Sequence, residues 1–199
     1  GGIASDVVVR GFQRDNLAVT IDGARLHGAC PNRMDPPSFH IDYAEVERVE
    51  LRKGPYDVAS PGGLGATLDV RTRNPGRGAS GEVSVGYGQV GSFELSGTAG
   101  YGAERLGLLS CLAFEEAHPF LFFNETASTE IYTAASANRY RGEVLGQEAY
   151  DVKTGWAKGT WSPLDGHRAE LSYAIQQADH VLYPFLKMDA RYDDTHRVN

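Results

Sequence analysis

The sequence has few of the features that mark most enzymes and nucleic-acid-binding proteins. Acidic residues outnumber basic ones and the formal net charge is -7, which argues against a surface for nucleic acid. No phosphate-binding loop, dinucleotide-binding glycine pattern, HExxH zinc motif or nucleophile-elbow serine occurs. We therefore expect a protein that is not an enzyme and does not bind nucleic acid.

Cysteine and long apolar runs are also scarce. The two cysteines, Cys30 and Cys111, lie far apart in the sequence, and we expect no disulfide between them. No segment approaches the roughly 18 apolar residues that a membrane-spanning helix needs. Spanning β-strands remain possible, because they alternate apolar and polar residues and leave only a weak hydropathy signal.

Residues 1–74 and residues 81–199 differ in their pattern of apolar residues and turns. Residues 1–74 contain short apolar runs and tight turns, with predicted strands at Leu17–Ile21 and Ala66–Thr72, and Asp22-Gly23 predicts a hairpin turn. Asp42 followed by Glu45 resembles a helix capping pair. Residues 75–80 are rich in turn formers and predict a linker.

Residues 81–199 show alternating segments that predict long strands. Four apolar side chains share one face of the strand expected over 105–114, namely Leu106, Leu108, Leu112 and Phe114. Such alternation is typical of transmembrane strands, but a soluble β-sandwich has the same period. The connections run short, short, long, short, long, and outer-membrane barrels also alternate short turns with long loops.

We expect about five strands in this region, predicted over 82–87, 93–101, 105–114, 150–162 and 168–176, with a long loop after Val181. Five strands are too few to close a membrane barrel. The chain is therefore expected to be a fragment of a longer protein.

Four runs in the first region occur in a characteristic order: VRGF at 9–12, VTIDGAR at 19–25, VERVELRKGP at 46–55 and GGLG at 62–65. In this order and spacing they resemble the plug domain of TonB-dependent outer-membrane receptors. The resemblance implies an α+β plug with a small mixed sheet, followed by the first strands of a transmembrane antiparallel β-barrel. It assigns residues 1–74 to the C-terminal part of the plug and 81–199 to the incomplete barrel.

The same resemblance implies a function and partners. Receptors of this family import a metal ion or metal chelate across the bacterial outer membrane, with TonB as the energy-coupling partner. The box that contacts TonB is expected N-terminal to this chain, and the barrel is expected to contact outer-membrane lipid.

A possible metal site lies at Cys30 to Met34, which reads CPNRM and is followed by DPP. Pro31 suits the first position of a helical turn, and the prolines after Asp35 discourage continuation. One turn would bring the Cys30 thiolate and the Met34 thioether to the same side. Two soft sulfur ligands favour Cu(I).

This stretch is similar to that of outer-membrane copper receptors of the OprC/NosA type. In those receptors the plug pair is joined by a His-x-Met pair from the barrel. No such pair occurs here, so the remaining ligands are expected beyond residue 199. The resemblance makes Cys30 and Met34 the predicted copper ligands.

Other interpretations stay open. Cys30 and Met34 could be packing residues in a receptor for a siderophore or another chelate, or the chain could be a soluble β-rich binding module. Cys111 is expected to point into the lumen as a small filler. Weaker metal-ligand candidates flank the CPNRM stretch or lie in or beside the last loop: His27, His40, His180, Met188 and His196.

Overall fold

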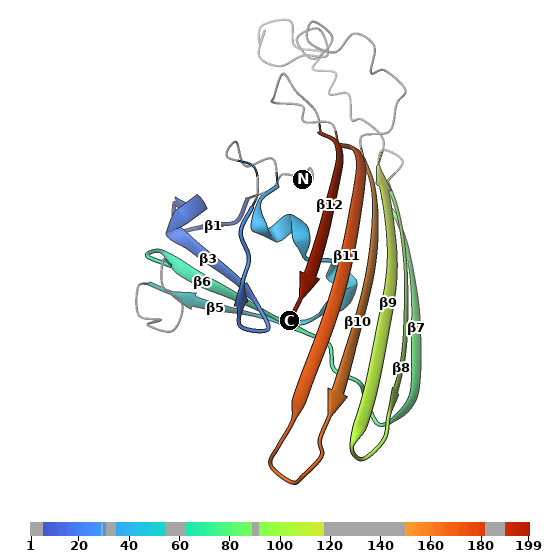
Figure 1. Ribbon diagram of the computed structural model, residues 1–199. Coiled ribbons are helices and arrows are strands. Elements are labelled where there is room, and N and C mark those ends of the chain that lie inside the picture. Colours follow the sequence, from blue (N-terminus) through green and yellow to red (C-terminus); the bar gives the residue numbers. More distant parts are fainter. Residues whose placement is uncertain are drawn as a thin grey trace, which may run out of the picture.

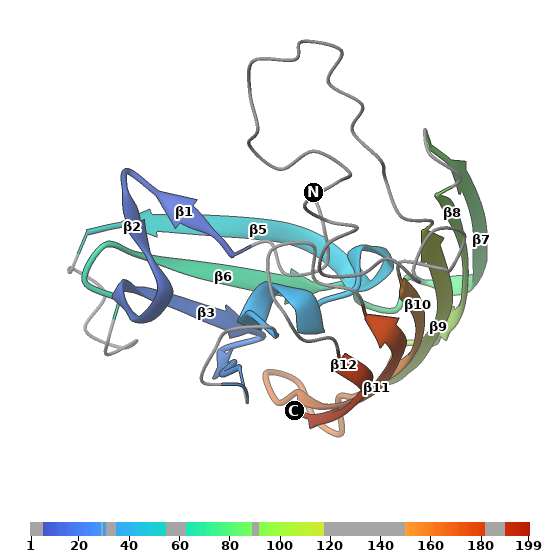
Figure 2. The same ribbon diagram turned by 90° about the horizontal axis from the view of Figure 1, so that it is seen from above.

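The computed structural model describes residues 6–28, 30, 35–54, 63–88, 92–117, 150–181 and 190–199. A long curved sheet of six strands forms one wall, and a smaller unit lies on its concave side (Figure 1, Figure 2). This smaller unit, residues 6–74, is called the inner unit below. Among the described residues, no helix has the length and apolar character needed to cross a membrane.

The inner unit is built on a four-stranded mixed sheet. Its order is β4 (Ala24–Arg25), β3 (Leu17–Ile21), β6 (Ala66–Thr72) and β5 (Val46–Lys53), with β3 parallel to β6. All of β3 is buried, which agrees with its apolar sequence. Its predicted bounds and those of β6 are confirmed, as is the mixed sheet.

Two local predictions for the inner unit, a hairpin turn and a capping pair, are also confirmed. Asp22 and Gly23 have φ angles of 48° and 87° and turn β3 into β4, which explains why glycine suits the second position. The capping pair is confirmed at η3 (Tyr43–Glu45): Asp42 Oδ1 accepts the Ala44 N–H at 2.7 Å, and Glu45 Oε1 accepts the Asp42 N–H at 3.2 Å. The remaining short elements are β1 (Val8–Val9), β2 (Phe12–Gln13), η1 (Arg14–Asn16) and η2 (Pro37–His40).

The curved sheet is an antiparallel meander in which each strand pairs with its neighbours in sequence. Its strands are β7 (Gly78–Tyr87), β8 (Phe93–Gly102), β9 (Leu106–Ala117), β10 (Tyr150–Trp161), β11 (Ala169–Val181) and β12 (Ala190–Val198). The connections 103–105 and 162–168 are short and lie at the lower end in Figure 1. The predicted long loop at 117–149 lies almost entirely outside the described residues.

Three expectations about this sheet were wrong. There are six strands instead of five, because β12 occupies part of the predicted final loop. β11 continues to Val181, and β7 begins at Gly78, inside the predicted linker 75–80. β12 reads ARYDDTHRV, and its many polar residues hide the apolar alternation on which the prediction depended.

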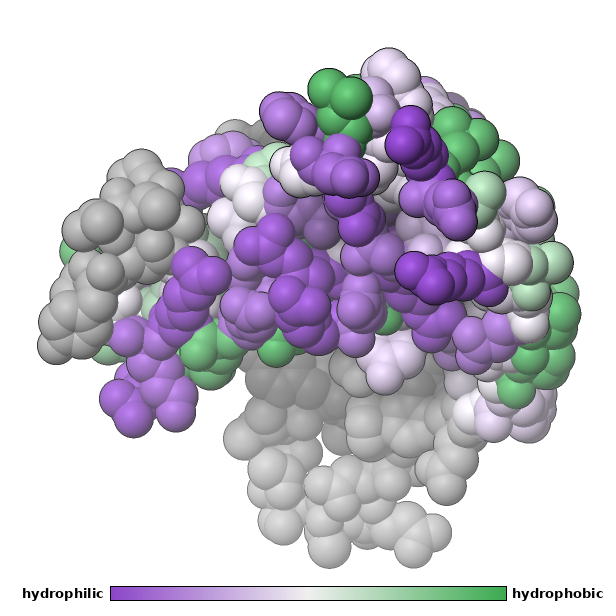
Figure 3. Space-filling model, turned by 90° about the horizontal axis from the view of Figure 1, so that it is seen from below, coloured by the Kyte–Doolittle hydropathy of each residue, from purple (hydrophilic) through white to green (hydrophobic). Residues whose placement is uncertain are grey.

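The two faces of the curved sheet differ in chemistry. On the convex face, Leu106, Leu108 and Leu112 are exposed, with Leu112 at 73%. On the concave face, Cys111 and Trp156 are buried against Ala44 of the inner unit. Figure 3 shows hydrophobic residues along the outer edge of the sheet and hydrophilic ones toward the inner unit. The soluble-module interpretation required these leucines to be buried, and they are exposed.

Candidate metal-binding residues and the interface around them

Cys30 is a half-buried free cysteine at one end of the CPNRM stretch. Its backbone N–H donates a hydrogen bond of 2.8 Å to Oδ1 of Asp35, whose residue is only 3% exposed. Met34 lies outside the described residues, so the convergence of the two sulfur atoms stays a prediction. The sequence analysis did not identify Asp35 as a functional residue.

His40 stands on the other side of Asp35. Its Nε2 lies 3.5 Å from Asp35 Oδ2, and its side chain is 8% exposed. Its Nδ1 lies 3.2 Å from the hydroxyl of Thr195 on β12. His40 is thus a buried, hydrogen-bonded histidine that connects the inner unit to the curved sheet.

The short helix η2, which carries His40, is attached to the curved sheet through its backbone as well. Gln176 Nε2 donates to the Phe39 carbonyl at 3.0 Å, and Arg197 Nη1 donates to the His40 carbonyl at 2.9 Å. The Phe39 ring packs against a cluster of three buried wall residues, Val152, Ala178 and Val181. The segment that follows the CPNRM stretch is therefore fixed to β10, β11 and β12.

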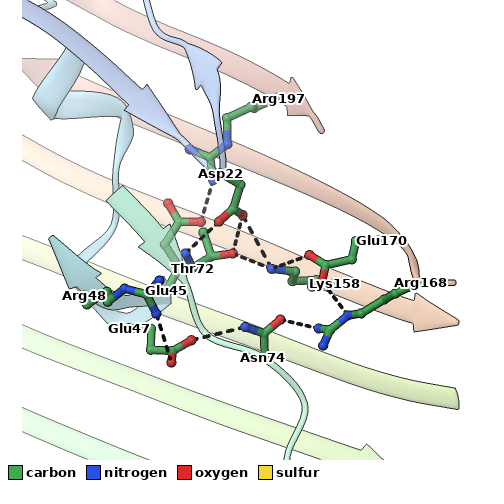
Figure 4. A network of polar contacts seen from close by, with 10 residues as sticks. All are labelled: Asp22, Glu45, Glu47, Arg48, Thr72, Asn74, Lys158, Arg168, Glu170 and Arg197. Atoms are coloured by element: carbon green, nitrogen blue, oxygen red, sulfur yellow. Dashed lines mark hydrogen bonds and ion pairs between the residues drawn. The ribbon is translucent and has the colours of Figure 1, made fainter. Parts of the chain in front are cut away.

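A second attachment centres on Lys158 of β10, a cation whose side chain is 3% exposed. Its Nζ lies 3.1 Å from Thr72 Oγ1, 3.6 Å from Asp22 Oδ2 and 3.2 Å from Glu170 Oε2 (Figure 4). Burial raises the pKa of Asp22, but the hydrogen bonds from Thr72 and the Lys158 ammonium outweigh it, so the net pKa is below its ordinary value. Asp22 therefore binds Lys158 as a carboxylate.

A third attachment joins Arg197 of β12 to Glu45, which is 1% exposed. Arg197 Nη2 donates a short hydrogen bond to Glu45 Oε2 (Figure 4). Burial raises the pKa of Glu45 above its ordinary value, and the Arg197 guanidinium offsets that effect only in part. Arg197 thus supplies the counter-charge for a carboxylate that would be costly to bury alone.

At the lower, more exposed edge a chain of polar contacts continues the interface. Arg168 Nη2 donates to Asn74 Oδ1 at 2.8 Å, and Asn74 Nδ2 donates to Glu47 Oε2 at 3.2 Å (Figure 4). The inner unit and the curved sheet are thus joined by specific polar groups along β10, β11 and β12.

Comparison with known proteins agrees with this architecture. The family described as TonB-dependent Receptor Plug Domain matches residues 1–67. These residues belong to the TonB-dependent receptor plug family. The inner unit is thus the plug, and the curved sheet has the fold of the barrel wall that surrounds such a plug.

Solved structures of plugged barrels share this fold at low sequence identity. The structure titled "Copper transporter OprC" matches with a TM-score of 0.70 and 21% identity, over 87% of this chain and 25% of that chain. The FrpB iron transporter from Neisseria meningitidis matches with a TM-score of 0.67 and 16% identity, over 88% and 26%. The pyoverdine receptor FpvA from Pseudomonas aeruginosa gives 0.62 and 18%, over 87% and 22%. The chain thus spans about a quarter of each matched structure.

The remaining candidate ligands have varied environments. Cys111 is buried on the concave face of β9, as predicted for a small filler. His27 is exposed on the plug. His196 was expected in or beside a loop but lies within β12, where its Nδ1 is 2.7 Å from the Tyr173 hydroxyl. His180 belongs to β11, and Met188 lies outside the described residues.

The described part of the chain contains no group of three or more His, Cys, Asp or Glu residues suited to hold a metal ion. Sequence reasoning also missed Lys158 and Arg197, whose partners on the inner unit lie far away in the sequence.

Proposed function

We propose that this chain is part of a TonB-dependent transporter that imports copper across the bacterial outer membrane, with Cys30 and Met34 as the metal ligands on the plug. The observation that carries the proposal is the position of Cys30. It is a free, half-buried thiol on the plug, and its backbone is held by a buried carboxylate next to the barrel wall. A thiolate with a thioether four residues away suits Cu(I) better than hard cations.

The likeness in fold to the copper transporter OprC supports this choice. The chemistry of copper binding follows from the types of the two ligand residues. Copper binding would displace the Cys30 proton, since the thiolate is the ligand form of cysteine. The metal is cargo, so the protein binds, holds and releases it without covalent chemistry. TonB would drive release by acting on a box N-terminal to this chain.

With the curved sheet as part of a barrel, the protein would lie in the bacterial outer membrane. The exposed leucines of β9 would face outer-membrane lipid, and the opposite, buried face of the same wall meets the plug through both apolar and polar side chains. Further copper ligands would come from barrel segments beyond residue 199.

A receptor for a siderophore or another metal chelate is the second candidate. It is supported by comparable fold likeness to FpvA, whose structure holds pyoverdine, and to the iron transporter FrpB. In that case Cys30 and Met34 would be packing residues, and substituting Cys30 would leave chelate uptake nearly unchanged.

The test is the copper content of the intact receptor, purified from outer membranes of cells grown with added copper and measured by mass spectrometry. We expect nearly one copper per receptor, lost in both Cys30→Ala and Met34→Ala. Cys111→Ala is the matched control, because it removes the other free thiol, and it should keep the metal. Copper that is absent from the unaltered receptor, or unaffected by both substitutions, would contradict the proposal and favour a chelate ligand.

A further inference from the structure

Asp35 lies between Cys30 and the barrel wall. We infer that Asp35 is a positioning residue for copper binding, which fixes Cys30 relative to strand β12 through His40. The inference rests on the proposed function, because it takes Cys30 as a ligand. It adds a residue that touches no metal and a physical link between the plug site and the barrel.

The first step is the contact between Asp35 and Cys30. The Asp35 Oδ1 atom accepts the Cys30 N–H at 2.8 Å, which joins the first residue of the CPNRM stretch to the residue that follows the stretch. A hydrogen bond to an ionised acceptor is about twice as strong as a neutral one. Gly28 makes room for Asp35, because a Cβ there would clash with the Asp35 carbonyl oxygen.

The second step is the contact between Asp35 and His40. The other carboxylate oxygen, Oδ2, lies 3.5 Å from His40 Nε2. Both side chains are more than nine-tenths buried, so this contact is only weakly screened by water. One carboxylate therefore faces the candidate ligand with one oxygen and the histidine with the other.

The third step joins His40 to the wall. The Nδ1 atom lies 3.2 Å from Thr195 Oγ1, and the His40 carbonyl accepts from Arg197 at 2.9 Å. Both partners belong to β12. A path of three contacts thus runs from Cys30 through Asp35 and His40 to β12. Ligands contributed by the barrel would then keep a constant position relative to Cys30.

Groups that orient metal ligands without binding the metal typically affect affinity by about 10- to 100-fold. The experiment uses the intact receptor in detergent and measures Cu(I) affinity by competition with a Cu(I)-specific chelator. We expect Asp35→Ala to weaken binding by about 10-fold or more, since the Cys30 N–H loses its acceptor. Asp35→Asn keeps a side-chain oxygen for that N–H and should lose less. Asp42→Ala is the matched control: it removes a plug aspartate that accepts a backbone N–H from Ala44 instead of Cys30, and affinity should be unchanged.

A second readout does not depend on copper. The rate at which N-ethylmaleimide alkylates Cys30 in the metal-free receptor, followed by peptide mass spectrometry, reports how firmly the residue is held. We expect faster alkylation in Asp35→Ala and in His40→Ala than in Asp42→Ala. His40→Ala keeps this test available if Asp35→Ala does not fold.

The outcomes separate the two proposals. Copper retained in Cys30→Ala would defeat the proposed function, while the alkylation rates would still test the positioning role. Copper lost in Cys30→Ala, together with wild-type affinity and alkylation in Asp35→Ala or His40→Ala, would overturn the positioning role and leave the proposed function standing.

Discussion

Lys158 of the barrel wall and Asp22 of the plug face each other across the interface, with Nζ 3.6 Å from Oδ2 and the Thr72 hydroxyl bonded to both side chains. The lysine side chain is almost fully buried, and the aspartate sits in the turn that ends β3. The contact attaches the β3–β4 hairpin of the plug to β10.

Replacing this lysine tests the attachment. Lys158→Met should lower the free energy of unfolding of the plug by about 2 kcal/mol, the scale of a lost hydrogen bond to a charged group. The measurement is the urea concentration at which the plug of the intact receptor becomes sensitive to protease. Lys153→Met is the matched control, because Lys153 lies on the same strand but is exposed, with Asp151 as its partner. Equal effects of the two substitutions would contradict a specific role for Lys158.

The charge on Asp22 predicts a pH dependence. Its pKa is lower in the folded protein than the ordinary 3.8, so its contribution to stability is present above that value and is lost as the pH falls through the folded pKa. At pH 7 the free energy of unfolding of the wild type should exceed that of Asp22→Asn by about 1 kcal/mol, a value that allows for screening by solvent. The difference should shrink below about pH 4 in the same protease assay. A difference that stays constant down to pH 2 would show that the charge is not involved.

The ion pair of Arg197 with Glu45 predicts a pH dependence of the opposite sign, in which the stability of Arg197→Met rises as the pH falls. Arg197→Met leaves the Glu45 carboxylate buried without its counter-charge, which typically costs about 3–5 kcal/mol at neutral pH. Because the pKa of Glu45 is already raised above 4.5, its protonated form stabilises the fold below that value, and this stabilisation is lost as the pH rises through the folded pKa. Acidification should therefore restore part of the stability of Arg197→Met. A deficit that does not change between pH 7 and pH 4.5 would contradict this explanation.

The convex face of β9 tests the membrane assignment. Leu112 is exposed in the middle of the strand, and Leu112→Arg should destabilise the folded barrel in lipid by about 2–4 kcal/mol if that position lies near the bilayer midplane. Leu112→Phe keeps the apolar character and should fold normally. The measurement is the yield of folded receptor in phospholipid vesicles. Equal yields for the two variants would show that this face does not contact lipid.

Local patterns made much of the fold predictable. The apolar run Leu17–Ile21, the Asp22-Gly23 turn and the Asp42–Glu45 capping box each carry their signal within a few residues. β12 lacked such a signal, because its inward side chains, including Thr195 and Arg197, are polar to match a polar plug.

The interface residues could not be identified from local patterns. Glu45 and Arg197 are separated by 152 positions, and Thr72 and Lys158 by 86, so only the fold brings them together. Cys30 was singled out for its chemistry, yet the carboxylate that holds it was overlooked, since a lone aspartate before two prolines reads as an ordinary turn. The Cys30–Met34 pair itself stays a prediction.

The polar contacts between plug and wall have a mechanical consequence. When apolar surfaces are pulled apart in water, each Å² of newly exposed apolar area costs about 25 cal/mol of free energy. This cost favours closing the surfaces again. Charged and hydrogen-bonding groups such as Lys158, Asp22 and Arg197 can exchange each lost partner for water as they separate. We therefore expect these polar contacts to separate one at a time under an applied pull and to re-form when the pull ends.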